Sequence, residues 1–266
     1  MPQKFTSTCT GPTLLEYFIS RGADLLAVDN YGQNALHNML APIDRISYGP
    51  VPIIDASRKY LVQNCPSLLD QPDNAGIFPI HYALRRMDDF SHQVPRPMLY
   101  YERAVYELLA ANADPFVRDS RGNTVLHYLA AGRLGEGGHP GDEQRRLLAV
   151  FLERGVDPKI RNAAGVTALE LVFMKKALYE MDYDYDQFYA IGKEVVDAFE
   201  QKGYVLTDTN TTGETLLHLV AESDSSRSVP WFELLKEKGL DPEAKDNNGV
   251  TPLESAKRNH SLRQYK

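Results

Sequence analysis

Residues 119–127 read Asp-Ser-Arg-Gly-Asn-Thr-Val-Leu-His, and this nine-residue phrase occurs six times along the chain. The copies begin at residues 29, 73, 119, 162, 210 and 246. Each has Gly in the fourth position and Leu or Ile in the eighth, while four have Thr in the sixth and four end in His. Asp or Asn shortly before Gly is typical of a tight turn, and Thr before an apolar run is a common helix N-cap. Each copy therefore predicts a turn that leads into a helix.

A second Gly, or in one case an Asn, stands as a marker ten residues before five of the six glycines of the phrase. Gly and Asn suit this position because a helix commonly ends at a residue in the left-handed conformation. The residues eight, seven and four places before each marker are apolar, and this spacing forms one stripe on a helix. The sequence thus predicts a second helix ending at each of these helix-end residues, namely Gly22, Asn112, Gly155, Gly203 and Gly239.

The phrase resembles the T-P-L-H-x-A signature of the ankyrin repeat, in which a β-turn precedes two helices. The nearest copies are Thr251-Pro252-Leu253 and Thr124-Val125-Leu126-His127. The resemblance covers about residues 11–258 and implies an all-α solenoid of six repeats that occupies residues 1–266 as a single unit. Residues 11–22 supply only a second helix, so they are expected to form an N-terminal half-repeat.

The spacing of the repeats departs from the family. Successive glycines of the phrase are 44, 46, 43, 48 and 36 residues apart, against about 33 in the standard repeat. The extra residues are expected between the first and second helix, near 43–56, 89–97, 134–142, 175–187 and 223–228. The Gly-rich stretch 135–141 and prolines 50, 52, 95 and 97 predict loops, whereas residues 172–191 lack Gly and Pro and predict longer helices.

The C-terminal repeat has a short first helix, expected over 253–258, and no apolar stripe after it. Its apolar flank is therefore thinly covered. This predicts that the chain is cut from a longer solenoid, or that a partner or another copy covers this end by association.

Composition limits the classes of function. The net charge of −7 argues against a nucleic-acid partner, which requires a basic face. Basic residues such as Arg145 and Arg146 are scattered and are expected to be solvated. We expect no membrane association, because no apolar run reaches the roughly 18 residues of a membrane span, and no secretory signal is visible. Cys9 and Cys65 form no disulfide framework. A cytoplasmic or nuclear location is expected.

No catalytic motif is present, and we expect no catalytic residues, no cofactor and no metal. The histidines at the ninth position (His37, His81, His127 and His218) are the strongest metal candidates. Repeats in a solenoid lie about 10 Å apart, too far to share a zinc ion bound at about 2 Å. The resemblance implies instead that each histidine supports the neighbouring turn through ring-nitrogen hydrogen bonds. Glu170 and Glu254 at the same position fit that role.

The resemblance implies a protein or peptide partner on the hairpin tips and the concave face of the first helices. The exposed tip positions are expected two and one before each glycine and one after it. The partner-binding residues predicted there are Tyr31, Gln33, Ile77, Arg121, Asn123 and Glu214. Of these, Tyr31, Ile77 and Arg121 are the preferred anchors.

Residues 179–189 interleave acidic and aromatic side chains, with Tyr183 and Tyr185 at the centre. They predict either an acidic aromatic platform for a basic peptide or a helix whose rings pack on a neighbour. Taken together, the sequence predicts a non-catalytic interaction module, either an adaptor or scaffold. The alternative is a regulatory or substrate-recognition part of a larger enzyme or complex.

Overall fold

The computed structural model describes residues 14–40, 51–85, 98–132, 134, 138–174, 185–223 and 228–263. Within these ranges the regular structure is helical, and extended pairing is limited to one bridge between Arg161 and Thr167. The prediction of an all-α fold is confirmed.

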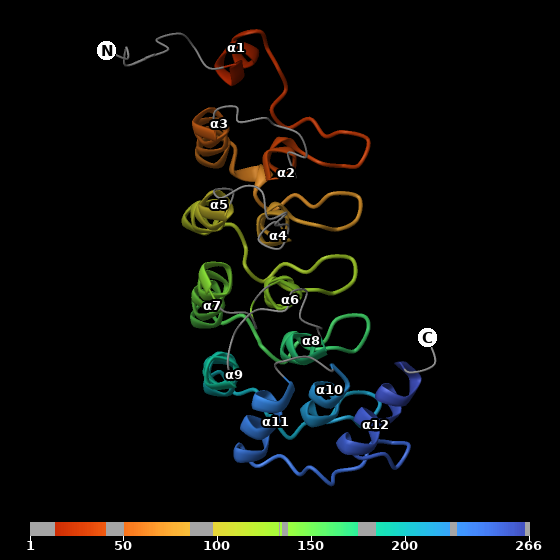
Figure 1. The fold of residues 1–266 in the computed structure, drawn as a ribbon. Coiled ribbons are helices and arrows are strands. Elements are labelled where there is room, and N and C mark those ends of the chain that lie inside the picture. The colour runs from red at the N-terminus through yellow and green to blue at the C-terminus, as the bar shows by residue number, and fades with distance from the viewer. Residues whose placement is uncertain are drawn as a thin grey trace, which may run out of the picture.

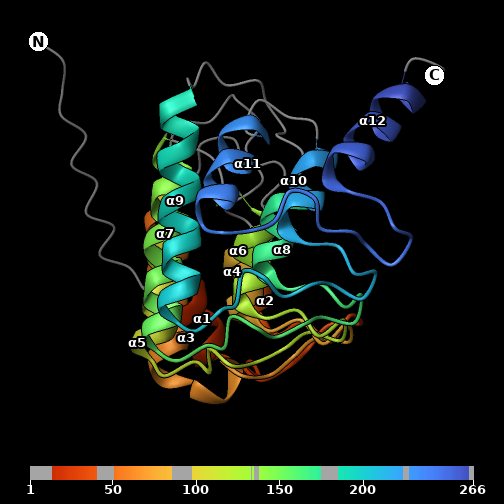
Figure 2. The same ribbon diagram turned by 90° about the horizontal axis from the view of Figure 1, so that it is seen from below.

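The helices form two columns that run the length of the molecule (Figure 1). One column contains the first helices: α2 (Ala35–Leu40), α4 (Pro79–Arg85), α6 (Val125–Ala131), α8 (Ala168–Met174), α10 (Leu216–Ser223) and α12 (Pro252–Arg263). The other contains the second helices: α1 (Leu14–Ser20), α3 (Val51–Asn64), α5 (Met98–Ala110), α7 (Gly138–Glu153), α9 (Tyr185–Gln201) and α11 (Ser228–Glu237). A short 3₁₀ helix, η1 (Pro66–Leu68), follows α3. The hairpins between the columns project on one side (Figure 2).

The predicted turn chemistry is present in all six hairpins. The tip glycines (Gly32, Gly76, Gly122, Gly165, Gly213 and Gly249) have φ between 71° and 79°. The helix-end residues also have positive φ, and Asn112 is the one non-glycine residue of this kind in the described part of the chain. At each helix end the following N–H donates to the carbonyl five residues back, as from Val156 to Phe151 at 3.1 Å. This is the Schellman pattern expected from the sequence.

The core lies between the two columns. The apolar residue at the eighth position of the phrase is buried in the first five copies, and so are Phe151 and Phe199 of the second helices. Trp231 packs edge-on against Phe173, and its indole N–H donates to the Phe188 carbonyl at 2.7 Å. Gly192 makes room for this ring, because a Cβ there would lie 2.6 Å from the indole. Close packing of this kind joins each repeat to the next.

The helix bounds place the inserts between first and second helices, as predicted. α9 begins at Tyr185 and has 17 residues, which agrees with the expected lengthening. The expected loop over 135–141 is wrong from Gly138 onward, because α7 begins there. Pro52 likewise lies in the first turn of α3. The N–H groups of a first helical turn have no intrahelical partner, so proline is tolerated there.

Both ends of the stack differ from the expected pattern. α12 continues to Arg263, five residues beyond the predicted end. Phe18, predicted to be part of a buried stripe, is 50% exposed, and Leu253 is 58% exposed. A repeat inside the stack buries the equivalent positions because it has a neighbouring repeat on each side. The two end repeats have a neighbouring repeat on one side only.

Arg145 is buried, which corrects the expectation of a solvated charge. Its guanidinium donates to Glu194 of α9 at 2.7 Å, to Asp142, and to the Leu134 carbonyl at 3.3 Å. Buried charges require such partners. The stem of Arg145 therefore packs between helices while its charged group links α7 to α9.

Candidate protein-interaction surface

The first residue of each phrase organises its hairpin. In all six copies its Oδ1 accepts the N–H groups two and four residues later. For example, Asp119 accepts from Arg121 at 2.9 Å and from Asn123 at 2.8 Å. Asp and Asn serve equally because only one acceptor oxygen is needed. Each hairpin is therefore ordered by hydrogen bonds between this side chain and the N–H groups of the same hairpin.

Neighbouring hairpins are also bonded to one another. At three of the five junctions, the N–H two residues before one tip glycine donates to the carbonyl just before the preceding tip glycine. These bonds run from Asn74 to Tyr31 at 2.9 Å, from Ala163 to Arg121 at 2.8 Å and from Asn247 to Thr212 at 3.0 Å. Ser120 Oγ donates to the Ala75 carbonyl at 2.5 Å at a fourth junction. The tips are thus fixed relative to each other.

The histidines at the ninth position support the next hairpin. In His127, Nδ1 accepts the Thr124 N–H at 3.2 Å, and Nε2 faces the Val166 carbonyl at 3.0 Å. A carbonyl only accepts, so the ring proton is on Nε2. His37 and His218 make the same pair of contacts. The predicted hydrogen-bonding role is confirmed for these three residues.

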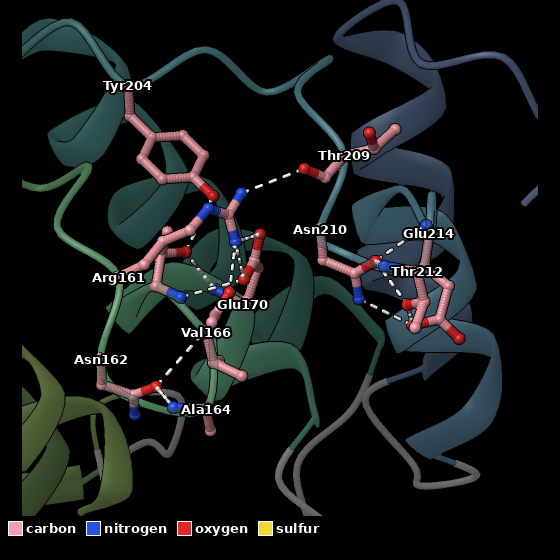
Figure 3. Close-up of polar contacts among 12 residues, drawn as sticks. Arg161, Asn162, Ala164, Val166, Glu170, Tyr204, Thr209, Asn210, Thr212 and Glu214 are labelled. Atoms are coloured by element: carbon pink, nitrogen blue, oxygen red, sulfur yellow. Dashed lines mark hydrogen bonds and ion pairs between the residues drawn. The ribbon is translucent and has the colours of Figure 1, made fainter. Parts of the chain in front are cut away.

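Glu170 performs the capping part of this role in the fourth repeat (Figure 3). Its Oε2 accepts the Thr167 N–H at 2.9 Å, and its carboxylate is paired with Arg161 at 2.9 Å. Arg161 then reaches the next hairpin, where it donates to the Thr209 carbonyl at 3.0 Å. The pair of Glu170 and Arg161 therefore replaces one histidine, with the carboxylate as the cap and the guanidinium as the bridge.

A row of polar side chains joins the hairpins to the first helices. Tyr82 of α4 donates to Asp73 Oδ2 at 2.9 Å and accepts from Gln33 Nε2 at 2.7 Å, which connects the first two hairpins. Burial and the bond to Asp73 raise the pKa of Tyr82 to about 12, so its proton stays in place at neutral pH. Tyr128 donates to Asp119 at 2.9 Å in the same way.

No protein-family model and no curated protein sequence match the chain. Among solved structures, it is similar to the crystal structure of the ankyrin repeat domain of Bcl-3, described as a unique member of the IkappaB protein family. The similarity covers 94% of this chain and 90% of that chain, with a TM-score of 0.58 and 19% identical residues. The chain has the ankyrin-repeat fold.

The ankyrin hairpins present only some of the predicted partner-binding residues to solvent. Tyr31 is 71% exposed, and Arg121 is exposed as well. Ile77 is partly exposed. Tyr183 lies outside the described residues, whereas Tyr185 is exposed at the start of α9. Tyr31, Ile77 and Arg121 come from three successive ankyrin repeats.

The prediction that the residue after each tip glycine is an exposed tip is wrong. Gln33, Ile77, Asn123 and Glu214 are partly buried, and Val250 is buried. This residue returns toward the helix, and in three of the six copies its carbonyl accepts the ring proton of the preceding histidine, as in Ile77 with His37 at 2.9 Å. The side chains of Asn123 and Glu214 also bond to the first residue of their own phrase.

Two exposed apolar side chains were missed by the sequence reasoning. Leu26 and Phe116 occupy the same ankyrin position, four residues after a helix-end residue, and both are more than half exposed. The corresponding residues Lys159, Thr207 and Glu243 are polar. Comparing this position across the repeats would have revealed the two exceptions.

The tyrosine-rich stretch is explained in part by packing between ankyrin repeats. Tyr185 stacks on Tyr189 with ring centroids 6.3 Å apart, and Tyr189 donates to Glu237 of α11. Phe188 is buried. These contacts favour the interpretation of a helix that packs on its neighbour for residues 185–189, while residues 179–184 lie outside the described ranges.

The described residues contain no group of three or more His, Cys, Asp or Glu side chains placed to hold a metal ion. The same part of the chain has no helix that is long and apolar enough to span a membrane.

His81 is the exception among the ankyrin histidines. Its ring stacks on Tyr128 with centroids 4.5 Å apart, and its buried Nε2 makes no hydrogen bond of normal geometry. Burial lowers the pKa of His81 to about 4, against smaller opposite effects of Asp119 and the Val117 carbonyl. Burial also lowers the pKa of His37 and His127.

These shifts predict acid sensitivity. An unfolded histidine binds a proton near pH 6.5, whereas the folded state disfavours that proton. The contribution of the neutral histidine to the free energy of unfolding is therefore fully present above pH 6.5 and is lost as the pH falls toward 4. For His81 alone the loss between pH 7 and pH 5 is about 2 kcal/mol. Urea unfolding should show that His81→Gln loses less free energy of unfolding between pH 7 and pH 5 than the wild type does. Equal losses in the two proteins would contradict the assignment.

Proposed function

We propose that the chain is a protein-binding module that holds a partner on its hairpin tips and on the concave face of its first helices. The observation that carries the proposal is a set of tips fixed by hydrogen bonds to each other, on which the exposed side chains differ from repeat to repeat. A binding surface that is already ordered loses little conformational entropy when a partner binds.

Three anchors are proposed on this surface. Tyr31 supplies a large exposed ring, Arg121 an exposed guanidinium and Ile77 a partly exposed aliphatic group. Aromatic and arginine side chains contribute most of the binding energy in many interfaces. The backbone carbonyls of Tyr31 and Arg121 accept bonds from the next hairpin, so both residues are positioned by the main chain.

The test compares partner capture from the source cells by wild type and by the triple variant Tyr31→Ala, Ile77→Ala, Arg121→Ala. We expect a protein that wild type retains and the triple variant loses by at least about tenfold, the effect of 1.4 kcal/mol. Circular dichroism should show equal helix content, because none of the three side chains lies in the core.

A matched control has three alanine substitutions on the second-helix side, at Gln63, Glu153 and Lys202. These residues are exposed near the C-terminal ends of α3, α7 and α9. The control should retain the partner as wild type does. If the control loses the partner while the tip variant keeps it, the proposed surface is wrong. An enzyme recovered as the partner would favour the regulatory alternative.

A further inference from the structure

The two ends of the stack each carry half of an ankyrin repeat. Among the described residues, α1 is a second helix with no first helix before it, and α12 is a first helix with no second helix after it. Figure 1 shows the two at opposite ends of the columns. The half-repeats are complementary, since each has the element that the other lacks.

The apolar residues at both ends are exposed where the missing element would pack. Phe18 of α1 is half exposed, whereas its equivalents four residues before the helix end, Leu108, Phe151, Phe199 and Leu235, are all fully buried. Leu253 of α12 is exposed, whereas its equivalents Leu36, Ile80, Leu126, Leu169 and Leu217 are all buried. In a complete repeat these two positions belong to the same core.

The hairpins at the ends have complementary hydrogen-bonding groups. Asn30 corresponds to the donors Asn74, Ala163 and Asn247, yet its N–H has no acceptor among the described residues. Asn248 corresponds to the acceptors Tyr31, Arg121 and Thr212, and in the same part of the chain its carbonyl accepts no hydrogen bond. One end thus offers the donor, and the other the acceptor, of the bond that joins neighbouring hairpins.

Two charged residues at the C-terminal end, Lys245 and Glu254, occupy the positions that Arg161 and Glu170 have at an internal junction. Glu254 accepts the Thr251 N–H at 2.9 Å, as Glu170 does from Thr167. Lys245 precedes its phrase as Arg161 does, and Arg161 bridges to the Thr209 carbonyl of the next hairpin. The residue that corresponds to Thr209 in the first hairpin is Val28.

We propose that copies of this chain associate head to tail, with α12 of one copy and α1 of the next forming a composite ankyrin repeat. Phe18 and Leu253 pack in its core, Asn30 donates to Asn248 of the neighbouring copy, and Lys245 reaches the Val28 carbonyl. The contact joins different surfaces of the two copies, so it leaves one free end of each kind and association continues beyond a dimer.

The test uses sedimentation velocity over a wide range of concentrations, with Phe18→Asp and Leu253→Asp as variants that block one end each. Wild type should grow beyond a dimer as its concentration rises, and each variant alone should remain monomeric. An equimolar mixture of the two variants should form a dimer and nothing larger, because the mixture contains one intact pair of ends. Phe116→Asp, on an internal hairpin, is the control that should associate as wild type does.

The mixture keeps the test valid even if Phe18→Asp unwinds α1, since that variant contributes only its C-terminal end to the dimer. A wild-type protein that is monomeric at every concentration would overturn the proposal. So would a Leu253→Asp variant that associates as well as wild type, because this would indicate a symmetric contact between N-terminal ends. The inference does not depend on the proposed function, and the tip variants test the latter separately.

Discussion

Glu107→Ala should lower the free energy of unfolding by about 3–5 kcal/mol, because it removes a carboxylate to which a buried arginine is hydrogen-bonded. Arg58 of α3 has no solvent exposure, and its Nε and Nη2 donate to Glu107 Oε2 of α5 at 3.0 and 2.8 Å. Arg103 donates to the other carboxylate oxygen at 3.0 Å. Urea unfolding followed by circular dichroism measures the change.

The double variant Arg58→Met, Glu107→Leu separates the cost of removing one member of a buried ion pair from the net contribution of the pair to stability. Replacing both members of a buried pair with apolar residues of similar volume is often close to neutral. The double variant should therefore regain most of the stability that Glu107→Ala loses. If it is as unstable as the single variant, the loss comes from packing and the assignment to the buried charge is incorrect.

Gly76→Ala should lower the free energy of unfolding by about 2–5 kcal/mol. A residue with a Cβ at φ 71° incurs about 1–2 kcal/mol of strain. The new Cβ would also lie 2.7 Å from the backbone nitrogen of Ser120 in the next hairpin. Forcing the two backbones apart adds about 1–3 kcal/mol, as overpacking does in a core.

Gly249→Ala is the matched control for this prediction. Its φ of 74° is nearly the same, and a Cβ there would meet nothing within 4 Å. This variant should therefore lose only the backbone strain, about 1–2 kcal/mol. Equal midpoints of urea unfolding for Gly76→Ala and Gly249→Ala would mean that the hairpins do not stack closely.

The hairpins and helix ends could be predicted from the sequence because local chemistry determines them. Gly122 must adopt positive φ, Asp119 supplies the acceptor for two N–H groups, and Thr124 with His127 caps the helix. Each of these interactions spans four residues or fewer. Six repetitions of the same pattern made the prediction of the fold robust.

Contacts between repeats could not be predicted in the same way. The pairing of Arg58 with Glu107 joins residues 49 positions apart, and the spacing of the repeats varies along the chain. The replacement of a histidine by Glu170 with Arg161 also depends on how two hairpins meet. Glycine and proline over 138–141 predicted a loop, yet a first helical turn accommodates them.

Some of the predicted binding residues are exposed and others are hydrogen-bonded and partly buried, and their place in the turn explains the difference. Tyr31 and Arg121 precede a tip glycine, where the chain is farthest from the helices, and both are exposed. Gln33, Asn123 and Glu214 follow the glycine; Gln33 is hydrogen-bonded to Tyr82 of α4, and the other two are hydrogen-bonded within their own hairpins. Sequence position alone does not distinguish these two sides of the turn, whereas the path of the backbone does.

Hydrogen exchange of the chain with and without its captured partner tests the proposed interaction surface most directly. We predict added protection over residues 29–34, 73–78 and 119–124, the hairpins that carry Tyr31, Ile77 and Arg121. The second helices α3, α5 and α7 should exchange as they do in the free protein. Protection confined to those second helices, or to residues 185–189 of α9, would contradict the account.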